Sequence, residues 1–373
     1  MRILYYLQQF PAYGGIEVVT ATVANRFAEL GHDVYIISHL EGDGSCIALR
    51  LDPRIHLQKM PERANYSKAN RDFLQGYIRD NGIDVVIFQD SYAQVERNLF
   101  PNETQAKVIV CEHNMPYCAP APEEISRLRD KVRRIRFEIN EAKRKRFLYK
   151  HCDRYVLLSK YFYGDFRALT RLSDTRKLRA IPNPMSPNLL RREVLKEKEI
   201  LMASTLSPGK GAVRLVRVWQ KIALRHEDWR ITIIGDGEER KRIEDFIRNQ
   251  RIPRVHIDGY QPDPSKYFAR ASIYAMMSRR EGWGLVLVEA MANGCVPVAF
   301  DSYGAVHDII SEGADGVTVP AFDEDSFASS LDFLMTHPET LLRYRARGIE
   351  SARRYEVENV VDKAWGGLLR ECT

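Results

Sequence analysis

The sequence predicts an α/β protein built from two doubly wound domains, each a parallel sheet with helices on both faces. Short β-rich runs alternate with longer amphipathic runs through the 373 residues, an order that is typical of parallel sheets covered by helices. Runs such as VVIF at 85–88 and TIIG at 232–235 are apolar over most of their length, as strands buried on both faces usually are. The alternation starts again after Pro182, so two series of elements are expected.

Each expected strand is a short run rich in β-branched and aromatic residues, and each expected helix carries apolar residues at helical spacing. In the first series, strands are expected at 3–7, 33–39, 84–88, 107–111 and 154–159, and helices at about 15–30, 64–81 and 122–150. In the second series, strands are expected at 199–205, 230–235, 254–258, 272–276, 296–300 and 316–320, and helices near 210–225, 237–249, 284–293 and 304–311. The tail from 338 to 373 is expected to form two helices, interrupted near Tyr355.

The joint between the two series is predicted at IPNPMSPN, residues 181–188. Its three prolines and two asparagines are incompatible with a helix or a central strand. The prediction therefore divides the chain into a first domain of residues 1–182 and a second domain of residues 183–355.

Composition places the chain among ordinary globular proteins, with 45% hydrophobic and 28% charged residues. No run approaches the roughly 18 consecutive apolar residues that a membrane-spanning helix needs. The amino terminus, MRILYYLQQF, lacks the longer apolar region of a signal peptide and is expected to be a buried strand. Six cysteines form no CxxC pair, which favours reduced, mostly buried thiols in a cytoplasmic protein. The net charge of +6 suggests an anionic partner.

Residues 278–294 contain the most informative pattern, in which a strand is followed by a glycine-rich turn and a helix that opens near Gly284. Unpaired N–H groups and the helix dipole make such a helix start suitable for a diphosphate. Gly282 and Gly284 would let a ligand approach the backbone closely. Glu281 and Glu289 would accept hydrogen bonds from sugar or ribose hydroxyls. The alternative interpretation is a helix with one capping acid and one solvated glutamate.

A second candidate is Lys210, which lies between Gly209 and Gly211 on a loop that joins a strand to a helix. A lysine there suits a phosphate group as a point charge. The segment is not a Walker A loop, because Ser204 replaces its first glycine and Gly211 replaces its Ser/Thr. A solvated surface lysine is the alternative.

Together these motifs resemble the family-4 retaining glycosyltransferases, which have the two-domain GT-B fold. The spacing Glu281-x7-Glu289, followed by Ala-Met-Ala-x-Gly-x-x-Pro-Val, is similar to the family signature. Other family-like segments occur in the family's order: Gly14-Gly15-Ile16-Glu17, Glu112-His113-Asn114, Ile181-Pro182-Asn183-Pro184, the Lys210 loop and Gly235-Asp-Gly-Glu238. The resemblance covers the whole chain.

The resemblance implies a cleft between the two domains, a nucleotide-sugar donor on the second domain and an acceptor near Gly15 and His113 on the first. It also implies a C-terminal helix, residues 356–373, that crosses back to the first domain, and a reaction that needs no metal or other cofactor. The catalytic residues expected from it are Glu281, Lys210 and His113. The donor-binding residues expected are Gly15, Lys210, Gly284, Leu285, Val286, Glu289, Thr205 and Arg280. A hydrogen-bonded core histidine is the alternative interpretation of His113.

Ser204-Thr205 departs from the family, which usually has Gly-Arg at these two positions. That arginine helps the lysine to hold the leaving diphosphate, and losing such a contact costs a few kcal/mol unless it is replaced. Arg279 or Arg280 is the hypothetical replacement. The departure also raises the alternative of a catalytically silent subunit that only binds nucleotide sugars.

Residues 127–150 are predicted to form a basic amphipathic helix. They contain eleven Lys or Arg and three Asp or Glu, a local net charge of +8. Contact with an anionic membrane surface or with a lipid-diphosphate acceptor is the functional interpretation, and a solvated charged face is the other. Nucleic acid is not expected as a partner, since no aromatic-rich groove motif accompanies the charge.

The sequence therefore predicts a retaining glycosyltransferase that moves a hexose or N-acetylhexosamine from a nucleotide sugar to a glycan or lipid-linked acceptor. A UDP-sugar is favoured, because Phe300-Asp-Ser-Tyr-Gly304 resembles the segment of members that use uridine-linked hexoses. The expected setting is bacterial surface polysaccharide synthesis, in the cytoplasm or at the inner face of the membrane. A sugar-nucleotide epimerase or a phosphorylase on the same fold is the remaining alternative.

Overall fold

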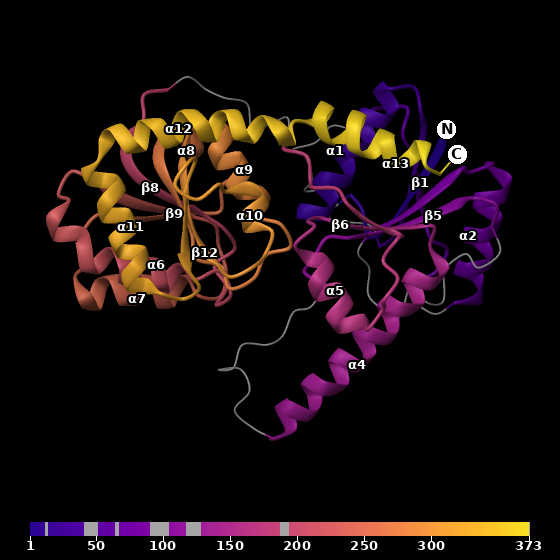
Figure 1. The fold of residues 1–373 in the computed structure, drawn as a ribbon, viewed down its shortest axis with the longest axis horizontal. Coiled ribbons are helices and arrows are strands. Elements are labelled where there is room, and N and C mark those ends of the chain that lie inside the picture. The colour runs from indigo at the N-terminus through magenta and orange to yellow at the C-terminus, as the bar shows by residue number, and fades with distance from the viewer. Residues whose placement is uncertain are drawn as a thin grey trace. The chain divides into compact units, whose positions relative to one another are not determined.

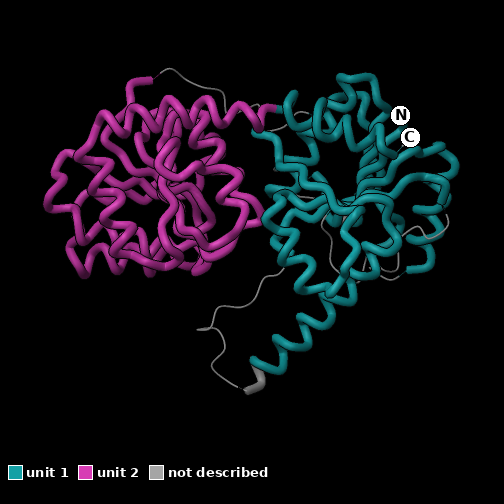
Figure 2. Tube along the Cα trace, in the orientation of Figure 1, with its two compact units in different colours: residues 1–186, 357–373 teal, residues 187–356 magenta. Residues whose placement is uncertain are grey.

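The computed structural model describes residues 1–11, 14–40, 51–63, 67–89, 104–116, 128–186 and 194–372. The chain forms two compact units, one of residues 1–186 and 357–373 and the other of residues 187–356 (Figure 2). Each unit contains one parallel sheet with helices packed around it (Figure 1). The predicted fold class, two doubly wound α/β domains, is confirmed.

The first unit has a seven-stranded sheet in the order β3-β2-β1-β4-β5-β6-β7, with every neighbouring pair parallel. Its strands are β1 (Arg2–Gln9), β2 (Asp33–Leu40), β3 (His56–Lys59), β4 (Val85–Gln89), β5 (Lys107–Glu112), β6 (Arg154–Leu157) and β7 (Leu178–Ala180). The sequence did not predict β3 and β7. Both lie at a sheet edge and are short, and the exposed HLQK of β3 carries no apolar run.

Four helices accompany this sheet within the first part of the chain that the structure describes: α1 (Gly15–Glu29), α2 (Lys68–Asp80), α4 (Leu128–His151) and α5 (Phe162–Thr170). Ser67 caps α2 by accepting a 2.9 Å hydrogen bond from the N–H of Asn70, as N-terminal serines often do. The predicted helix at 122–150 is confirmed from Leu128 onward, and residues 122–127 lie outside the described residues. Helix α5 was not predicted.

The second unit has a six-stranded parallel sheet in the order β10-β9-β8-β11-β12-β13. All six of its strands were predicted, and they are β8 (Glu197–Ala203), β9 (Arg230–Ile234), β10 (Val255–Gly259), β11 (Ala271–Met276), β12 (Val296–Asp301) and β13 (Val317–Pro320). Its helices are α6 (Ala212–Ile222), α7 (Arg240–Gln250), α8 (Ser265–Arg270), α9 (Leu285–Ala292), α10 (Val306–Ile309), α11 (Glu324–Thr336) and α12 (Pro338–Ala352). Its apolar core includes Trp219, Ile231, Ile273 and Val298, all fully buried.

The carboxy-terminal tail is interrupted where the sequence predicted. Helix α12 ends at Ala352, a single 3-10 turn covers Arg353–Tyr355, and a π-helix (Glu358–Trp365) and α13 (Gly366–Arg370) follow. The π-helix belongs to the first unit. It is held to α1 by an ion pair between Arg26 and Asp362, with Nη2 2.6 Å from Oδ2, and by an edge contact between the rings of Phe27 and Trp365.

Four cysteines lie in the described residues, and all four are buried thiols that form no disulfide: Cys111, Cys152, Cys295 and Cys372. This agrees with the prediction of reduced thiols. Cys46 and Cys118 lie outside the described residues.

Candidate donor site and the acceptor-side edge

A pocket of about 230 Å³ opens in the second unit at the carboxyl ends of β8 and β11. The strand order of the sheet reverses between these two neighbouring strands, and open α/β sheets bind their ligands at such a switch point. The pocket is lined by Met202, Ala203, Ser204, Thr205, Lys210, Tyr274, Ala275, Met276, Ser278, Glu281, Gly284, Leu285 and Val286. It thus brings together six of the ten residues predicted to form the site.

Lys210 and Glu281 meet at this pocket. Lys210 Nζ lies 2.6 Å from Glu281 Oε1, and the two side chains are 31% and 15% exposed. Lys210 sits in the turn between β8 and α6, where its N–H donates to Ser207 O at 3.0 Å. Arg279 N–H donates to Gly209 O at 2.8 Å and ties this turn to the loop that carries Glu281. The pair therefore joins two loops whose backbones are already linked.

The amino end of α9 faces the same pocket through Leu285 and Val286. Gly284 precedes the helix with φ 96°, in the left-handed region, and no side chain caps this end. The first N–H groups of a helix have no partner within it, and the dipole adds positive potential there. Tyr303, which belongs to the 300–304 segment but was not predicted as a site residue, lies beside Gly284, since a Cβ there would approach its hydroxyl to 2.5 Å. An uncapped helix start that lines a pocket suits an anion.

Ser204 and Thr205 line the pocket at the end of β8. Thr205 is exposed, and among the described residues no group lies within hydrogen-bond reach of the buried Ser204 Oγ. Tyr274, also missed by the sequence, donates its hydroxyl to Ala203 O at 3.0 Å, and burial raises its pKa well above the ordinary value. As a residue of a fully buried strand, Tyr274 gives no sequence signal beyond that of a core residue.

Two predicted site residues of this unit do not line the pocket, Arg280 and Glu289. Arg280 is half-buried in the loop between β11 and α9. Glu289 lies on α9 four residues after Leu285, so both are on one side of the helix. Burial raises the pKa of the Glu289 carboxyl to about 8. Replacement of the missing arginine by Arg279 or Arg280 stays a prediction.

His113 and Gly15 lie in the first unit, after the carboxyl ends of β5 and β1, and therefore at one edge of its parallel sheet. His113 is 7% exposed, and its Nε2 lies 2.5 Å from Oε1 of Gln89 at the end of β4. Burial lowers the pKa of His113 to about 4, against a smaller opposing effect from a hydrogen bond with Asn183. His113 is therefore neutral at pH 7 and donates from Nε2 to Gln89. The sequence missed Gln89, which has no motif around it.

Gly15 is the first residue of α1 and is exposed, with no atom within 4 Å of where a Cβ would stand. Beside His113, the Glu112 carboxylate is buried and bonded to Lys145 Nζ and to the hydroxyl of Tyr155. In the described parts of the chain, no three His, Cys, Asp or Glu side chains are grouped to hold a metal ion. Nor does any helix there combine the length and apolarity required to cross a bilayer.

Two family models match consecutive parts of the chain. The model described as "Glycosyltransferase Family 4" matches residues 13–189, and the model described as "Glycosyl transferases group 1" matches residues 191–353. An uncharacterized glycosyltransferase of Haemophilus influenzae is 26% identical over 380 residues, which cover 99% of each chain.

A shorter match is to the N-acetylgalactosamine-N,N'-diacetylbacillosaminyl-diphospho-undecaprenol 4-alpha-N-acetylgalactosaminyltransferase of Campylobacter jejuni, with 24% identity over 176 residues. It covers 47% of this chain and 47% of that relative, so less than half of the relative is matched. Among solved structures, HepE of Anabaena in complex with UDP and glucose aligns with a TM-score of 0.75 and 15% identity. The alignment covers 99% of this chain and 100% of HepE, and it establishes a shared fold.

Proposed function

This chain belongs to the family-4, or group 1, glycosyltransferases of GT-B type, and we propose that it transfers a hexose or N-acetylhexosamine from a UDP-sugar to a glycan or lipid-linked acceptor. The proposed transfer retains the anomeric configuration of the sugar. The observation that carries the proposal is the meeting of the Lys210 ammonium group and the uncapped start of α9 at one pocket. An ammonium group together with free main-chain N–H groups suits a diphosphate.

In the proposed complex the donor diphosphate lies against Lys210 Nζ and the N–H groups of Leu285 and Val286. Glu281 then releases Lys210 and accepts hydrogen bonds from the transferred sugar, while Glu289 holds the ribose. Charge develops on the leaving diphosphate as its bond to the sugar breaks, so groups that are already positioned and positive lower the barrier. The leaving phosphate oxygen takes the proton of the acceptor hydroxyl, which removes the need for a strong protein base.

We place the acceptor on the first unit, at the edge of the sheet that carries Gly15 and His113. Neutral His113, oriented by Gln89, would contact a sugar hydroxyl without adding charge. The relative from Campylobacter jejuni acts on a diphospho-undecaprenol acceptor by its name, which favours a lipid-linked acceptor and synthesis of a bacterial surface polysaccharide. The proposal includes a cytoplasmic location and contact with anionic lipid through residues 127–150.

The reaction is proposed to need no metal. Lys210 and the start of α9 supply positive charge where a metal ion would otherwise neutralise the diphosphate. Equal rates of UDP release with magnesium and with excess EDTA are expected, and a rate that falls with EDTA and returns with magnesium would remove this part of the proposal.

A thermal-shift screen of UDP- and GDP-sugars tests donor binding, and UDP release with a panel of glycan and lipid-linked acceptors tests transfer. NMR of the product then reports its anomeric configuration. We expect stabilisation by UDP-sugars, UDP release that depends on an acceptor, and a product with the anomeric configuration of the donor. Absence of a shift with every nucleotide sugar, or an inverted product, would contradict the proposal.

Thr205 favours a second candidate, a subunit that binds nucleotide sugars without turnover, because this pocket residue is uncharged where relatives usually carry arginine. Such a protein would be stabilised by UDP-sugars and would release no UDP with any acceptor. Thr205→Arg distinguishes the two: gain of turnover in this variant alone would favour the silent subunit, and turnover by the unaltered protein would exclude it.

A further inference from the structure

Helix α4 carries an apolar stripe that starts exposed and ends buried. Val132, Ile135 and Ile139 recur at helical spacing and are 59%, 57% and 48% exposed, whereas Ala142 on the same stripe is 6% exposed. Because i, i+3 and i+4 positions share one side of a helix, the exposed residues and Ala142 form one continuous apolar surface. The stripe therefore leads from solvent toward the body of the first unit.

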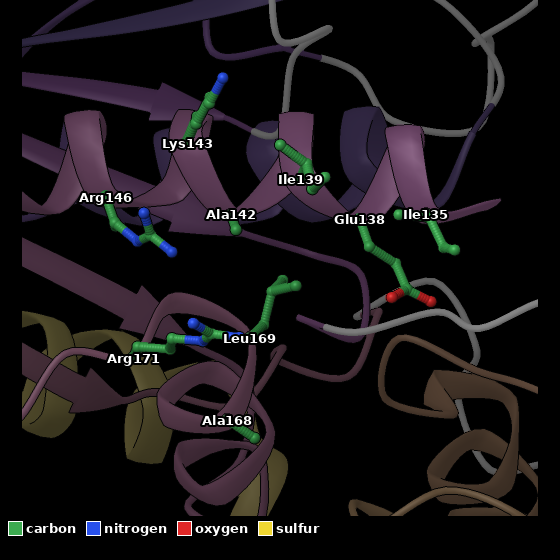
Figure 3. Close-up of a pocket in the computed structure, with 9 residues that line it drawn as sticks. All are labelled: Ile135, Glu138, Ile139, Ala142, Lys143, Arg146, Ala168, Leu169 and Arg171. Carbon is green, nitrogen blue, oxygen red and sulfur yellow. The ribbon is translucent and has the colours of Figure 1, made fainter. Parts of the chain in front are cut away.

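Where the stripe is partly covered, α4 and α5 enclose a groove of about 620 Å³. Leu169 of α5 and Ala142 of α4 point into it from opposite sides (Figure 3). Arg146 and Arg171 lie at one end of the groove, and Ile135 lies at the other. The volume falls in the range of about 300–1,000 Å³ found for small-molecule sites.

One contact and one backbone conformation fix the cationic end of this groove. Arg146 Nε donates to Thr170 O at 2.6 Å and holds the end of α5 against α4. Arg171, which ends α5 in the left-handed conformation with φ 56°, follows directly. Among the described residues that line the groove, Glu138 carries the one carboxylate. It pairs with Arg134 at 2.7 Å and lies away from Arg146 and Arg171 (Figure 3). The two guanidinium groups thus provide a concentrated positive end.

The groove also lies in the segment that holds the excess positive charge of the protein. Residues 127–150 carry a net charge of +8 and the whole chain carries +6, so all other residues together sum to −2. A charged face is ordinary for a surface helix, but a single segment that outweighs the rest of the chain indicates an anionic partner.

The groove is anchored next to the acceptor-side edge of the sheet. Lys145, 2% exposed, forms a buried ion pair with Glu112 at the end of β5, and Glu112 precedes His113 in the chain. Tyr155 Oη donates to the second oxygen of the same carboxylate at 2.7 Å. Helix α4, which forms one wall of the groove, is therefore tied to the residue that precedes His113.

We propose that the groove between α4 and α5 binds the carrier of a lipid-linked acceptor, a lipid diphosphate, with its hydrocarbon along Ile135, Ile139 and Leu169 and its phosphoryl groups at Arg146 and Arg171. The inference rests on the proposed function and names the acceptor class of that site. An apolar wall that leads to two guanidinium groups matches a chain that ends in a diphosphate. A free phosphate would make no use of the apolar wall, and a flat bilayer surface would not reach the recessed Ala142.

Binding of dansyl-labelled geranylgeranyl diphosphate, followed by fluorescence, tests the assignment on the full chain. Two variants address the two halves of the groove: Ile135→Ser/Ile139→Ser removes apolar contact at exposed positions, and Arg171→Gln removes one charge. Lys150→Gln, an exposed cation on α4 outside the groove, is the matched charge control. Leu224→Ser, 81% exposed in the second unit, is the matched apolar control.

We expect the probe to bind the unaltered protein, to bind the double variant and Arg171→Gln several-fold to tenfold more weakly, and to bind both controls normally. Geranylgeraniol and inorganic diphosphate should each compete poorly. Unchanged binding in both groove variants, or equal competition by inorganic diphosphate, would overturn the inference. The inference would also be overturned if the protein bound phosphatidylglycerol vesicles as tightly as the lipid diphosphate and the Ile135→Ser/Ile139→Ser variant bound the vesicles equally well. That result would indicate contact with a bilayer surface instead.

The UDP-induced thermal shift of every variant, measured in parallel, separates this inference from the proposed function. A groove variant that no longer binds the lipid probe but is still stabilised by UDP supports the inference. If the unaltered protein shows no UDP shift yet binds the lipid diphosphate through the groove, the proposed function fails and the lipid site stands.

Discussion

Lys210 Nζ and Glu281 Oε1 lie 2.6 Å apart in the lining of the donor-side pocket. Each side chain is predicted to contact the donor, one at the diphosphate and the other at the sugar. Without a ligand the two groups neutralise each other, so donor binding has to exchange this ion pair for contacts to the substrate. Because of this exchange, substitutions of Lys210 and of Glu281 should affect donor binding and turnover differently.

Lys210→Ala should lower turnover about 10²–10³-fold, because it removes a positioned charge from the leaving diphosphate. The measurement is initial UDP release at saturating donor. Lys221→Ala is the matched control, since Lys221 is an exposed lysine of α6 paired with Asp325 at 2.5 Å, and its turnover should be normal. Normal turnover in Lys210→Ala would remove the lysine from the mechanism.

Glu281→Gln should bind UDP up to about fivefold more tightly, since a partly exposed ion pair is worth up to about 1 kcal/mol and its loss frees the Lys210 ammonium group. Turnover of the same variant should fall, because the carboxylate contact to the sugar is lost. Titration calorimetry with UDP and steady-state kinetics together check this prediction. Weaker UDP binding by Glu281→Gln would mean that Glu281 does not compete for Lys210.

Gly284→Ala should destabilise the start of α9 and weaken UDP binding. Its φ of 96° costs an alanine about 1–2 kcal/mol, and the new Cβ would stand 2.5 Å from the Tyr303 hydroxyl. Gly209→Ala is the control for stability, because a Cβ at Gly209 meets no atom within 4 Å. Thermal unfolding with and without UDP measures both effects, and equal melting temperatures for the two variants would contradict the prediction.

Glu289 should make the stability of the ligand-free protein depend on pH. Burial raises its pKa from 4.5 to about 8, so between these values the folded state holds a proton that the unfolded chain has released. The contribution of Glu289 to the free energy of unfolding therefore falls as the pH rises from about 4.5 to about 8. Glu289→Gln should flatten the melting temperature across this window, and Glu227→Gln, at an exposed loop position, should not. If the melting temperatures of Glu289→Gln and the unaltered protein changed with pH in parallel, the raised pKa would be contradicted.

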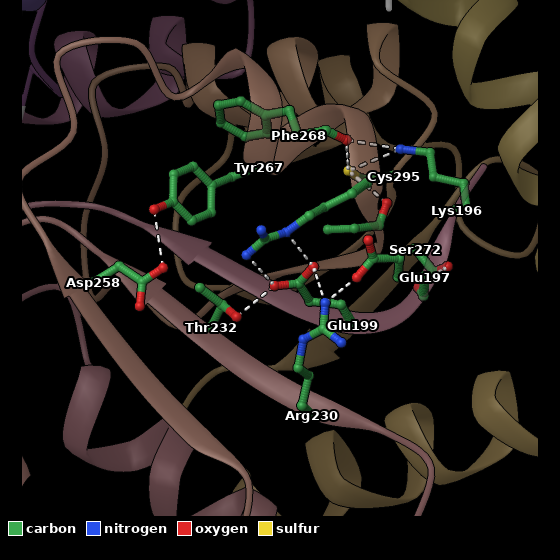
Figure 4. A network of polar contacts seen from close by, with 12 residues as sticks. Lys196, Glu197, Glu199, Arg230, Thr232, Asp258, Tyr267, Phe268, Ser272 and Cys295 are labelled. Carbon is green, nitrogen blue, oxygen red and sulfur yellow. Dashed lines mark hydrogen bonds and ion pairs between the residues drawn. The ribbon is translucent and has the colours of Figure 1, made fainter. Parts of the chain in front are cut away.

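Glu199→Ala should destabilise the second unit by about 2–3 kcal/mol, because it leaves the buried Thr232 hydroxyl and the half-buried Arg270 guanidinium group without their acceptor. Glu199 is fully buried and accepts from Arg270 Nε at 2.8 Å and Nη2 at 3.0 Å. It also accepts from the Thr232 hydroxyl (Figure 4). Glu197, which pairs with Arg230, is 45% exposed, so Glu197→Ala should cost no more than about 1 kcal/mol. Urea denaturation measures the difference, and equal costs would show that the buried network adds nothing.

The sequence by itself determined the doubly wound fold of both units and every central strand, because apolar runs and their spacing are local properties of the chain. It also placed Lys210, Glu281 and Gly284 in one candidate site, since glycine and charge at a strand-to-helix turn carry a local signal. It missed β3 and β7, which are four and three residues long and carry no apolar run. They become strands only because a neighbouring strand offers its edge.

Tertiary structure alone decided which side chains meet. Lys210 and Glu281 are 71 residues apart in the chain, and the link between Arg279 and the Lys210 turn is a backbone contact that no residue type announces. Tyr303 beside Gly284, Gln89 beside His113 and α5 against α4 are similar cases. Periodicity is set by each residue and its near neighbours, whereas pairing, burial and the raised pKa of Glu289 depend on groups that only the folded chain brings within a few ångströms.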